Sequence, residues 1–190
     1  MSGCHPGMRI VDVGCGNGEA VRRATELDCQ AWGVDIRHEV ARSAQSRCGT
    51  DRFVVGAATR LPVLSDSVDL VVAQHIVEHL RDPMEAIREW KRVLRPGGKL
   101  AIVTPNHRYP DPSIYEDPDH VRIFDAQELR RLLEAAAMRP IGSETIFPYL
   151  GGHTVFGLRH YRILSALPPW SSSGRSLLCV AKKPLEEGGR

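Results

Sequence analysis

The chain has 190 residues, of which 42% are hydrophobic and 25% are charged, a composition typical of a globular protein. Its 25 basic and 23 acidic residues leave a net charge of +2, which excludes a strong electrostatic attraction to nucleic acid or to an anionic membrane. No apolar run approaches the ~20 residues that cross a bilayer, and no signal peptide precedes the first expected strand, so we expect a cytoplasmic protein with one domain over residues 1–190.

A glycine-rich turn between a strand and a helix stands near the start of the chain. The apolar stretch Arg9–Val13 predicts a buried strand, and glycines follow it at positions 14, 16 and 18. The amphipathic stretch Glu19–Leu27 then predicts a helix. Glycine adopts backbone angles that other residues resist, and it lets a ligand approach the main chain closely. A strand, a glycine turn and a helix N-terminus together predict a nucleotide-type pocket.

The spacing of the glycines and the nearby charges narrow the choice of ligand. The dinucleotide-binding pattern is Gly-x-Gly-x-x-Gly, whereas here the glycines alternate and Glu19 stands where the helix begins. An acid at a helix N-terminus would repel a pyrophosphate, and Asp12 adds a second negative charge within the strand. These features count against a nicotinamide cofactor. They favour a cationic ligand without phosphate, such as S-adenosylmethionine with its sulfonium and amino groups.

The run Val11–Gly18 resembles motif I of the class I S-adenosylmethionine-dependent methyltransferases. The resemblance implies an α/β fold that is Rossmann-like, with a mostly parallel seven-stranded sheet, an antiparallel edge strand and helices on both faces. It also implies S-adenosyl-L-methionine as cofactor and S-adenosyl-L-homocysteine as product. The cofactor-binding residues that it implies within the motif are Asp12, Gly14, Cys15, Gly16 and Gly18.

Two further strands are expected to carry the other cofactor-binding residues. The second predicted strand ends in Asp35, about 20 residues past the glycine turn, where Rossmann-like sites place a carboxylate on the ribose hydroxyls. Ile36 follows and is expected to lie against the adenine. After the third strand, the methyltransferases that this chain resembles often have an aspartate that binds the adenine amino group, and this chain has Ala57 there. The backbone of Ala58 is expected to bind the adenine ring.

The fourth predicted strand, residues 68–73, is an apolar run suited to a buried parallel sheet. Ligands bind beyond the carboxyl ends of the strands in such sheets. Gln74 and His75, which follow this strand, are therefore expected beside the methyl group of the cofactor. His75, Glu78 and His79 stand three and four residues apart, a spacing that one helical turn brings to one side.

Three interpretations of this trio stay open at this point. His75 could be a general base that takes a proton from the methyl acceptor. The trio could instead hold a divalent metal, because histidine and carboxylate side chains suit one. The ubiquinone-biosynthesis O-methyltransferases are similar at this trio, with Glu and His matching Glu78 and His79. They differ in having Glu where this chain has His75. It could also be structural, since Glu78 and His79 pack under the cofactor in many members without a metal. We adopt His75 as the catalytic residue and assign no metal ligands.

The second half of the sequence continues the alternation of helices and strands. Asp82 and Asp125 are expected to cap helices over 84–94 and 126–138, and the run Arg-Pro-Gly-Gly at 95–98 is expected to end the first of them. The last strand is expected to pair antiparallel at the edge of the sheet. The remaining strands are predicted over residues 99–104, 141–147 and 176–181.

Two segments are expected to form the acceptor region, residues 105–123 and 148–174. The motif His-x-Arg-x-Phe that begins at His120 resembles a segment of many type 11-like methyltransferases. We expect Tyr115, His120 and Arg122 to contact the acceptor, because an arginine can hold an anionic group through two parallel hydrogen bonds. The alternative is that His120 and Arg122 cap the helix that follows.

These features predict an enzyme that moves a methyl group to an oxygen, nitrogen or carbon nucleophile of a small-molecule or lipid-like acceptor by in-line displacement. The alternatives are a non-catalytic S-adenosylmethionine-binding scaffold and an NAD-dependent Rossmann oxidoreductase. A nucleic-acid acceptor is not expected, because no Asn-Pro-Pro-Tyr-type motif follows the fourth strand and no basic face is evident. A homodimer is considered, because a second subunit could cover the active site.

Overall fold

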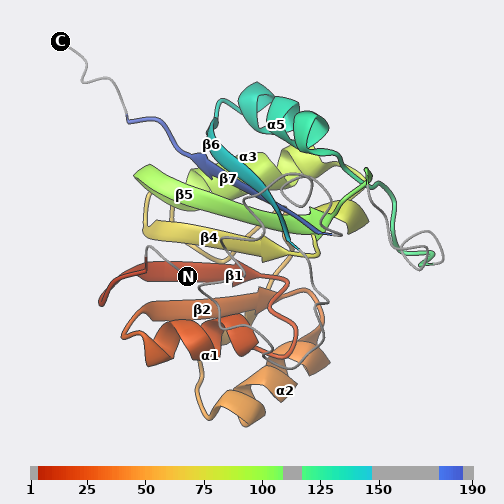
Figure 1. The fold of residues 1–190 in the computed structure, drawn as a ribbon. Helices are drawn as coiled ribbons and strands as arrows, with labels where there is room; N and C mark the ends of the chain where they lie inside the picture. Colours follow the sequence, from red (N-terminus) through yellow and green to blue (C-terminus); the bar gives the residue numbers. More distant parts are fainter. Residues whose placement is uncertain (1–3, 109–116, 147–175, 186–190) are drawn as a thin grey trace, which may run out of the picture.

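The computed structural model describes residues 4–108, 117–146 and 176–185, which build one twisted sheet with helices on both sides (Figure 1). The seven strands follow the order β3-β2-β1-β4-β5-β7-β6. Neighbouring strands are parallel except where β7 takes part, because β7 runs antiparallel to both β5 and β6. The predicted Rossmann-like, mostly parallel α/β sheet is therefore confirmed. Its antiparallel strand lies one place in from the edge, which β6 occupies.

The bounds of the elements agree with the prediction to within a few residues at most ends. The expected helix over 126–138 is shorter, because the backbone of Ala137 turns to a positive φ of 54°. The strands are β1 Arg9–Val13, β2 Gln30–Asp35, β3 Phe53–Val55, β4 Val68–Gln74, β5 Leu94–Pro105, β6 Arg139–Ile146 and β7 Ser176–Lys182, and the helices are α1 Glu19–Glu26, α2 His38–Cys48, the 3-10 turn η1 Val77–His79, α3 Pro83–Val93 and α5 Ala126–Ala135.

The largest difference from the predicted elements is at the start of β5. The Arg-Pro-Gly-Gly run at 95–98 is expected only to end a helix, yet β5 begins directly after α3, at Leu94. Leu94 pairs with Val68 of β4, and the register then shifts before regular pairing resumes at Lys99. The run therefore forms an irregularity within a long strand, as a β-bulge does. The end of α3 is at the same time the start of β5, with no loop between them.

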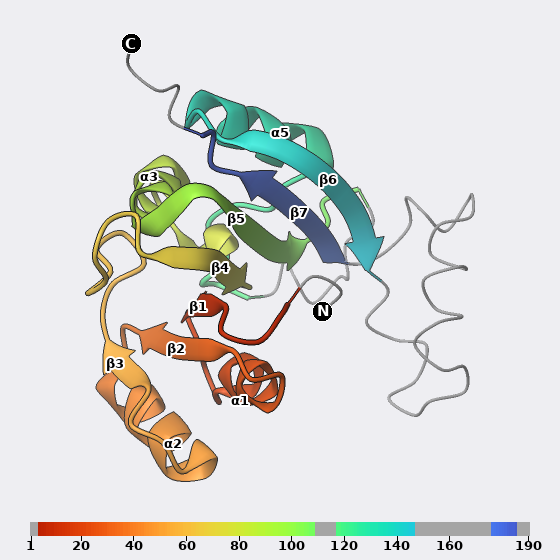
Figure 2. The same cartoon turned by 90° about the vertical axis from the view of Figure 1, so that its left-hand side faces the viewer.

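Successive residues of the strands point to opposite faces of the sheet and belong to two different cores. Val11 and Val13 of β1 belong to the larger core, together with Trp90 of α3 and Leu129 of α5. Ile10 of β1 belongs to the second core, which α1 and α2 cover. Figure 2 shows α1 and α3 on opposite sides of the strands. The molecule thus has three layers, with the sheet in the middle.

The order of the strands reverses between β1 and β4. The chain adds β2 and β3 on one side of β1, and β4 and β5 on the other side. In open α/β sheets, ligands bind beyond the carboxyl ends of the strands at such a switch point, because the connections diverge there. The glycine turn follows β1 and His75 follows β4. The fold therefore brings both predicted features to one crevice.

Two helices begin at the predicted capping residues. The Asp82 carboxylate accepts the N–H of Met84 at 3.0 Å at the start of α3. Asp125 and Glu128 form a capping box at the start of α5, with hydrogen bonds of 2.7 and 3.1 Å. None of the helices in the described parts of the chain is long and apolar enough to cross a membrane.

Replacing Gly18 by alanine is expected to lower the free energy of unfolding more than the same change at Gly49. Both glycines have a positive φ, 81° and 63°, so each variant carries a backbone strain of about 1–2 kcal/mol. Only at Gly18 would the new Cβ also collide with the Phe53 ring, 2.6 Å from Cζ, which adds about 1–3 kcal/mol. Urea unfolding of both variants measures the difference, and equal losses would contradict this packing.

Candidate functional site

The glycine turn between β1 and α1 has no room for a side chain at Gly14 or at Gly18. Its three glycines have φ values of 69°, 51° and 81°. The N–H of Gly14 donates to the carbonyl of Val34 in β2 at 2.7 Å. A Cβ on Gly14 would lie 1.9 Å from Cδ1 of Ile76, which follows the end of β4. The turn therefore brings the ends of β1, β2 and β4 into contact and leaves main chain where a ligand can approach.

Cys15 lies inside this turn but offers no reactive thiolate. Its side chain is buried, and burial together with the charges of Asp12 and Asp35 raises the pKa of the thiol to about 12. A thiolate is the nucleophilic form of cysteine, so this thiol is inert at neutral pH. Cys15 thus serves the site through its backbone and its packing.

Asp35 lies beside the glycine turn, as its position in the sequence predicts. Its buried carboxylate accepts the N–H of Gly16 at 3.3 Å and the N–H of Arg37 at 3.0 Å. The guanidinium of Arg37 lies 3.6 Å from the same carboxylate. Ile36, between them, is 70% exposed, so an apolar side chain stands in solvent next to the carboxylate.

Asp12 is the second buried carboxylate of the site. Burial, and then the charge of Asp35, raises its pKa to about 7. It also borders a cavity of about 390 Å³ on the side of the sheet that carries α1, together with Gln74 at the end of β4. Desolvation penalises an ionised carboxylate unless an opposite charge compensates it. The surroundings of Asp12 therefore favour a cationic partner.

The prediction that the negative charge of Glu19 would repel a pyrophosphate at the N-terminus of α1 is wrong. Glu19 stands in the first turn of α1, but its carboxylate pairs with Arg22 at 2.8 Å and with Arg23 at 2.6 Å. Hydrogen bonds from these two arginines lower the pKa of Glu19 to about 2. Its charge is therefore balanced on the exposed surface of α1. The negative charge that lines the turn comes from Asp12 and Asp35.

Ala57 and Ala58 follow β3 in a tight turn. The carbonyl of Ala57 accepts the N–H of Arg60 at 3.0 Å, and the carbonyl of Ala58 accepts the indole N–H of Trp90 at 2.9 Å. Both alanines are half-buried. The side chain of Ala57 has no acceptor for an adenine amino group. A contact between Ala58 and the adenine ring would come from its N–H, because Trp90 occupies its carbonyl.

His75 and Glu78 form a hydrogen-bonded pair at the end of β4. Nδ1 of His75 lies 3.0 Å from Oε1 of Glu78, whose side chain is fully buried. The other carboxylate oxygen accepts the hydroxyl of Thr104 at 3.1 Å. The His75 side chain is 45% exposed, and its backbone has a positive φ of 54°. A half-exposed polar side chain with one nitrogen anchored thus follows Gln74 at the end of β4.

The predicted trio does not gather as one metal-ligating group. The metal-compatible cluster of the described residues is Glu78, His79 and His120, whose ligand atoms lie within 4.8 Å of one another. Both oxygens of Glu78 already accept hydrogen bonds, and Nδ1 of His79 donates to the carbonyl of Asp119 at 2.9 Å. Each Glu78 oxygen thus accepts one hydrogen bond, and Nδ1 of His79 is already engaged, so His79 could offer a metal only its Nε2.

His120 and Arg122, two of the expected acceptor residues, contact different parts of the structure. The ring of His120 lies against His79, with ring centroids 4.8 Å apart. Arg122 lies over the Phe124 ring, 4.9 Å from its centroid, and is 3.5 Å from Glu128 of the α5 capping box. This arrangement agrees with the alternative that Arg122 supports the start of α5. Tyr115 and the segment 148–174 lie outside the described residues.

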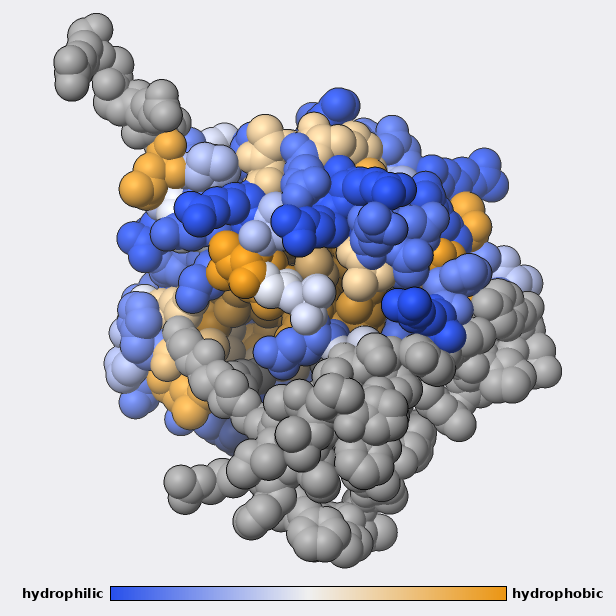
Figure 3. All heavy atoms as spheres, turned by 45° about the horizontal axis from the view of Figure 1, so that its top comes forward, coloured by the Kyte–Doolittle hydropathy of each residue, from blue (hydrophilic) through white to orange (hydrophobic). Residues whose placement is uncertain are grey.

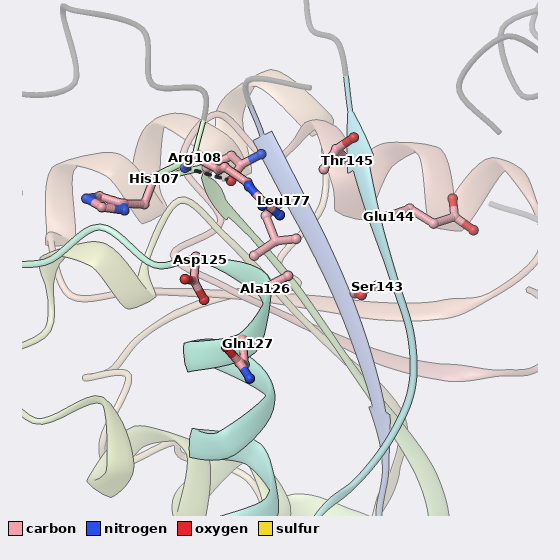
Figure 4. Close-up of a pocket in the computed structure, with 10 residues that line it drawn as sticks. His107, Arg108, Asp125, Ala126, Gln127, Ser143, Glu144, Thr145 and Leu177 are labelled. Atoms are coloured by element: carbon pink, nitrogen blue, oxygen red, sulfur yellow. Dashed lines mark hydrogen bonds between the residues drawn. The ribbon is translucent and has the colours of Figure 1, made fainter. Parts of the chain in front are cut away.

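A polar cavity of about 420 Å³ opens at the same edge of the sheet (Figure 4). Residues from four segments line it: residues 106–108 directly after β5, the start of α5, β6 and Leu177 of β7. Arg108 and His107 bring basic groups, while Asp125 and Glu144 bring acidic ones. Mixed polar groups of this kind can fix the orientation of a small ligand.

The surface around the second cavity is more apolar. That cavity, which Asp12 borders, follows β4, β5 and β7 along residues such as Val103 and Val180. In the space-filling view, hydrophobic residues gather in a hollow below a rim of hydrophilic residues (Figure 3). Apolar side chains of β4, β5 and β7 therefore form one wall of the cavity that Asp12 borders.

The sequence pattern does not predict the contribution of Thr104. This residue is fully buried near the end of β5, and its hydroxyl holds Glu78 in place. The available signal is its position: a threonine near the carboxyl end of an apolar strand, one residue past Val103, which pairs with Gln74 at the end of β4. Only the pairing of β4 with β5 shows that the two residues meet.

Comparison with known proteins gives the family of this fold. Residues 11–102 match a family model described as a methyltransferase domain. Over 159 residues the chain is 33% identical to 27-O-demethylrifamycin SV methyltransferase of Amycolatopsis mediterranei, which covers 75% of this chain and 58% of that protein. The chain spans between half and three fifths of the length of the first curated relatives it matches.

Solved structures share the fold at low sequence identity. Phosphoethanolamine N-methyltransferase 2 of Haemonchus contortus, in complex with S-adenosyl-L-methionine, matches with a TM-score of 0.72 and 20% identity over 96% of this chain and 50% of that chain. The [4+2]-cyclase SpnF matches with a TM-score of 0.68 and 24% identity over 95% of this chain and 77% of that chain. With the glycine turn, the strand order and the family model in agreement, the chain belongs to the class I S-adenosylmethionine-dependent methyltransferase superfamily.

Proposed function

We propose that the chain transfers a methyl group from S-adenosylmethionine to an oxygen, nitrogen or carbon nucleophile of a small-molecule or lipid-like acceptor. One observation carries this proposal: two buried carboxylates, Asp12 and Asp35, stand beside a glycine turn at the switch point of the sheet. Buried negative charge favours a cation, whereas it would oppose the pyrophosphate of a dinucleotide. The family model points to the same cofactor.

The residues present fit this cofactor. A Cβ on Gly14 would fill the turn, so residues 14–18 offer main chain to the ligand. When bound, S-adenosylmethionine supplies a methyl carbon that its sulfonium has already activated. Asp35 would hold the ribose hydroxyls, Ile36 and the N–H of Ala58 the adenine, and Asp12 and Gln74 the cationic end.

His75 is the proposed general base. It follows the strand next to the glycine turn, one nitrogen is held by Glu78, and nearly half of its side chain is exposed. A base in this place removes the proton that the acceptor loses, which contributes about 10²- to 10⁴-fold to the rate. His75 is not part of the metal-compatible group Glu78, His79 and His120, which favours the role of base over that of metal ligand for this residue.

The acceptor region is proposed to extend from His75 toward the polar cavity at the ends of β5 and β6. Its volume of about 420 Å³ suits a small molecule or a polar headgroup. His120 and Arg122 lie in the segment that connects these parts, and Tyr115 belongs to the same proposal. A single domain over residues 1–190, a cytoplasmic location and a homodimer are further proposals. A relative named for a rifamycin acceptor supports small-molecule chemistry.

Two alternative functions can be distinguished from methyl transfer by direct measurement. The match to a [4+2]-cyclase means that the fold alone does not prescribe methyl transfer, so a non-catalytic scaffold is the main rival. Transfer of a labelled methyl group to any acceptor excludes that scaffold. An NAD-dependent oxidoreductase is the weaker rival, and competition between the two cofactors excludes it.

Calorimetric titration is expected to show binding of S-adenosylhomocysteine and no binding of NAD. The variant Ala57→Asp should tighten that binding by on the order of 1 kcal/mol, or about fivefold, because it adds an acceptor for the adenine amino group. Thr59→Asp is the matched control for the added charge. Unchanged or weaker binding in Ala57→Asp would contradict the alignment of this turn.

Asp12 is expected to make the ligand-free protein less stable as the pH rises from about 4 to about 7. Its pKa is about 7 in the folded protein against 3.8 for the ordinary group, so between these values the folded state holds more protons than the unfolded state. The protonated Asp12 therefore stabilises the folded protein fully below a pH of about 4, and this stabilisation is lost as the pH rises through about 7.

Asp12→Asn removes this titration, so its free energy of unfolding should rise relative to the wild type between pH values of about 4 and 8. Asp51→Asn, an exposed change, is the control. Urea unfolding at several pH values measures the difference, and a constant gap between wild type and Asp12→Asn would refute the titration. Asp12→Asn should also bind S-adenosylhomocysteine more weakly.

Removing His75 is expected to slow turnover and spare the cofactor. With labelled S-adenosylmethionine and a panel of phenols, amines and hydroxylated lipids, His75→Ala should reduce the rate of methyl transfer by about 10²- to 10⁴-fold. Its affinity for S-adenosylhomocysteine should stay close to that of the wild type. His38→Ala, an exposed change on α2, serves as control. Full activity in His75→Ala would eliminate the general base.

A further inference from the structure

We propose that Glu78 is a positioning residue that determines which nitrogen of His75 carries the proton. The inference rests on the proposed function, in which His75 is the general base, and it deepens that function by naming the residue that prepares the base.

The carboxylate of Glu78 is held on both of its oxygens. The side chain is fully buried, with Oε1 at 3.0 Å from Nδ1 of His75 and Oε2 at 3.1 Å from the hydroxyl of Thr104. A buried charge is tolerated only when hydrogen-bond donors surround it. Thr104 and His75 supply these donors, one to each oxygen of the carboxylate.

This geometry selects one tautomer of His75. An ionised carboxylate only accepts hydrogen bonds, so the proton between the two groups belongs to Nδ1 of His75. A neutral imidazole with a proton on Nδ1 has its lone pair on Nε2. Since Nδ1 points to a fully buried group while 45% of the His75 side chain is exposed, the basic nitrogen belongs to the exposed part of the ring.

The backbone holds the ring at the crevice. His75 has a φ of 54°, which is uncommon for a residue other than glycine and stores backbone strain. Its N–H donates to the carbonyl of Val103 in β5 at 2.8 Å, which secures this conformation. The next residue, Ile76, packs against Gly14 of the cofactor turn. The strained residue is therefore fixed beside the turn from two sides.

Glu78 also anchors the segment that leads to the acceptor region. Its backbone carbonyl accepts the N–H of Val121 at 2.9 Å and the N–H of Arg122 at 3.1 Å. One residue thus joins β4, β5 and this segment through its side chain and its main chain. His75 and the segment around Val121 are therefore both held by hydrogen bonds to Glu78.

The consequence for the proton is specific. When the acceptor loses its proton, the bond between that hydrogen and the acceptor atom breaks, the electron pair stays on the acceptor, and the proton joins Nε2 of His75. The imidazolium that results carries its positive charge next to the carboxylate of Glu78, which stabilises it. The proton then leaves to solvent from the exposed nitrogen.

His79 provides an internal reference. Its Nδ1 lies 2.9 Å from the backbone carbonyl of Asp119, which also only accepts, so His79 has the same tautomer for an independent reason. A change in the side chain of Glu78 should leave this hydrogen bond in place. The two histidines therefore separate a local effect on the base from a general disturbance of the fold.

Nitrogen NMR on the full chain with labelled histidine tests the inference without cofactor or acceptor. At a pH of about 8, His75 is expected to carry its proton on Nδ1, as is His79. Glu78→Gln keeps the shape of the side chain but can donate as well as accept, so His75 should then show a mixture of both tautomers while His79 is unchanged. His75→Ala assigns the signal.

Turnover supplies the second measurement. Glu78→Gln should reduce the rate of methyl transfer about 10- to 100-fold, less than His75→Ala does, with the affinity for S-adenosylhomocysteine unchanged. Thr104→Val should give a smaller loss, and Thr104→Ser should restore the wild-type rate, because only a hydroxyl at this place can donate to Glu78. Should Glu78→Gln fail to fold, the tautomers of the wild type and of Thr104→Val decide.

Two results would overturn the inference: a wild-type His75 with its proton on Nε2, or a Glu78→Gln variant with unchanged tautomer and unchanged turnover. The proposed function fails separately. A wild type that has the Nδ1 tautomer but binds no S-adenosylhomocysteine would overturn the methyltransferase proposal while supporting the role of Glu78 in orienting His75.

Discussion

The contact between Gly14 and Ile76 is the constraint on which the rest of the site depends. A side chain at position 14 would overlap Ile76, so the ends of β1 and β4 come together only because the turn has none. The same glycine donates its N–H to Val34 of β2. Three strand ends therefore meet at one residue. Asp35 then stands on one side of the turn and His75 on the other, which separates the proposed cofactor-binding part from the proposed reacting part.

Charge explains why this meeting point suits a cation. Asp12 and Asp35 are both buried next to the turn, and burial with mutual repulsion raises the pKa of Asp12. The ligand-free protein pays for this arrangement in stability at neutral pH, as active sites commonly do. A positively charged ligand reverses the balance, since it favours the ionised carboxylate that the empty pocket disfavours.

Local patterns predicted the parts of the structure that depend on neighbouring residues. The glycine turn, the caps Asp82 and Asp125 and the strand that ends in Asp35 are all recognisable within a few positions of the sequence. The place of β7 inside the sheet is not recognisable in this way, because it depends on pairing with two distant strands. The role given to Glu19 was wrong because its charge was considered without Arg22 and Arg23, which are close enough on the helix to pair with it.

The same distinction separates the two halves of the site. In the proposed cofactor half, the glycine turn with Asp12 and the strand end at Asp35 each belong to a short stretch of sequence, so short motifs specify them. The proposed reacting half brings Thr104 of β5 to Glu78 and His75 after β4, and its polar cavity combines residues next to β5 with α5, β6 and β7. Side chains from separate elements can change independently. A new acceptor would therefore require changes around that cavity, whereas the Glu78–His75 pair, fixed to the sheet by Thr104 and Val103, can stay as it is.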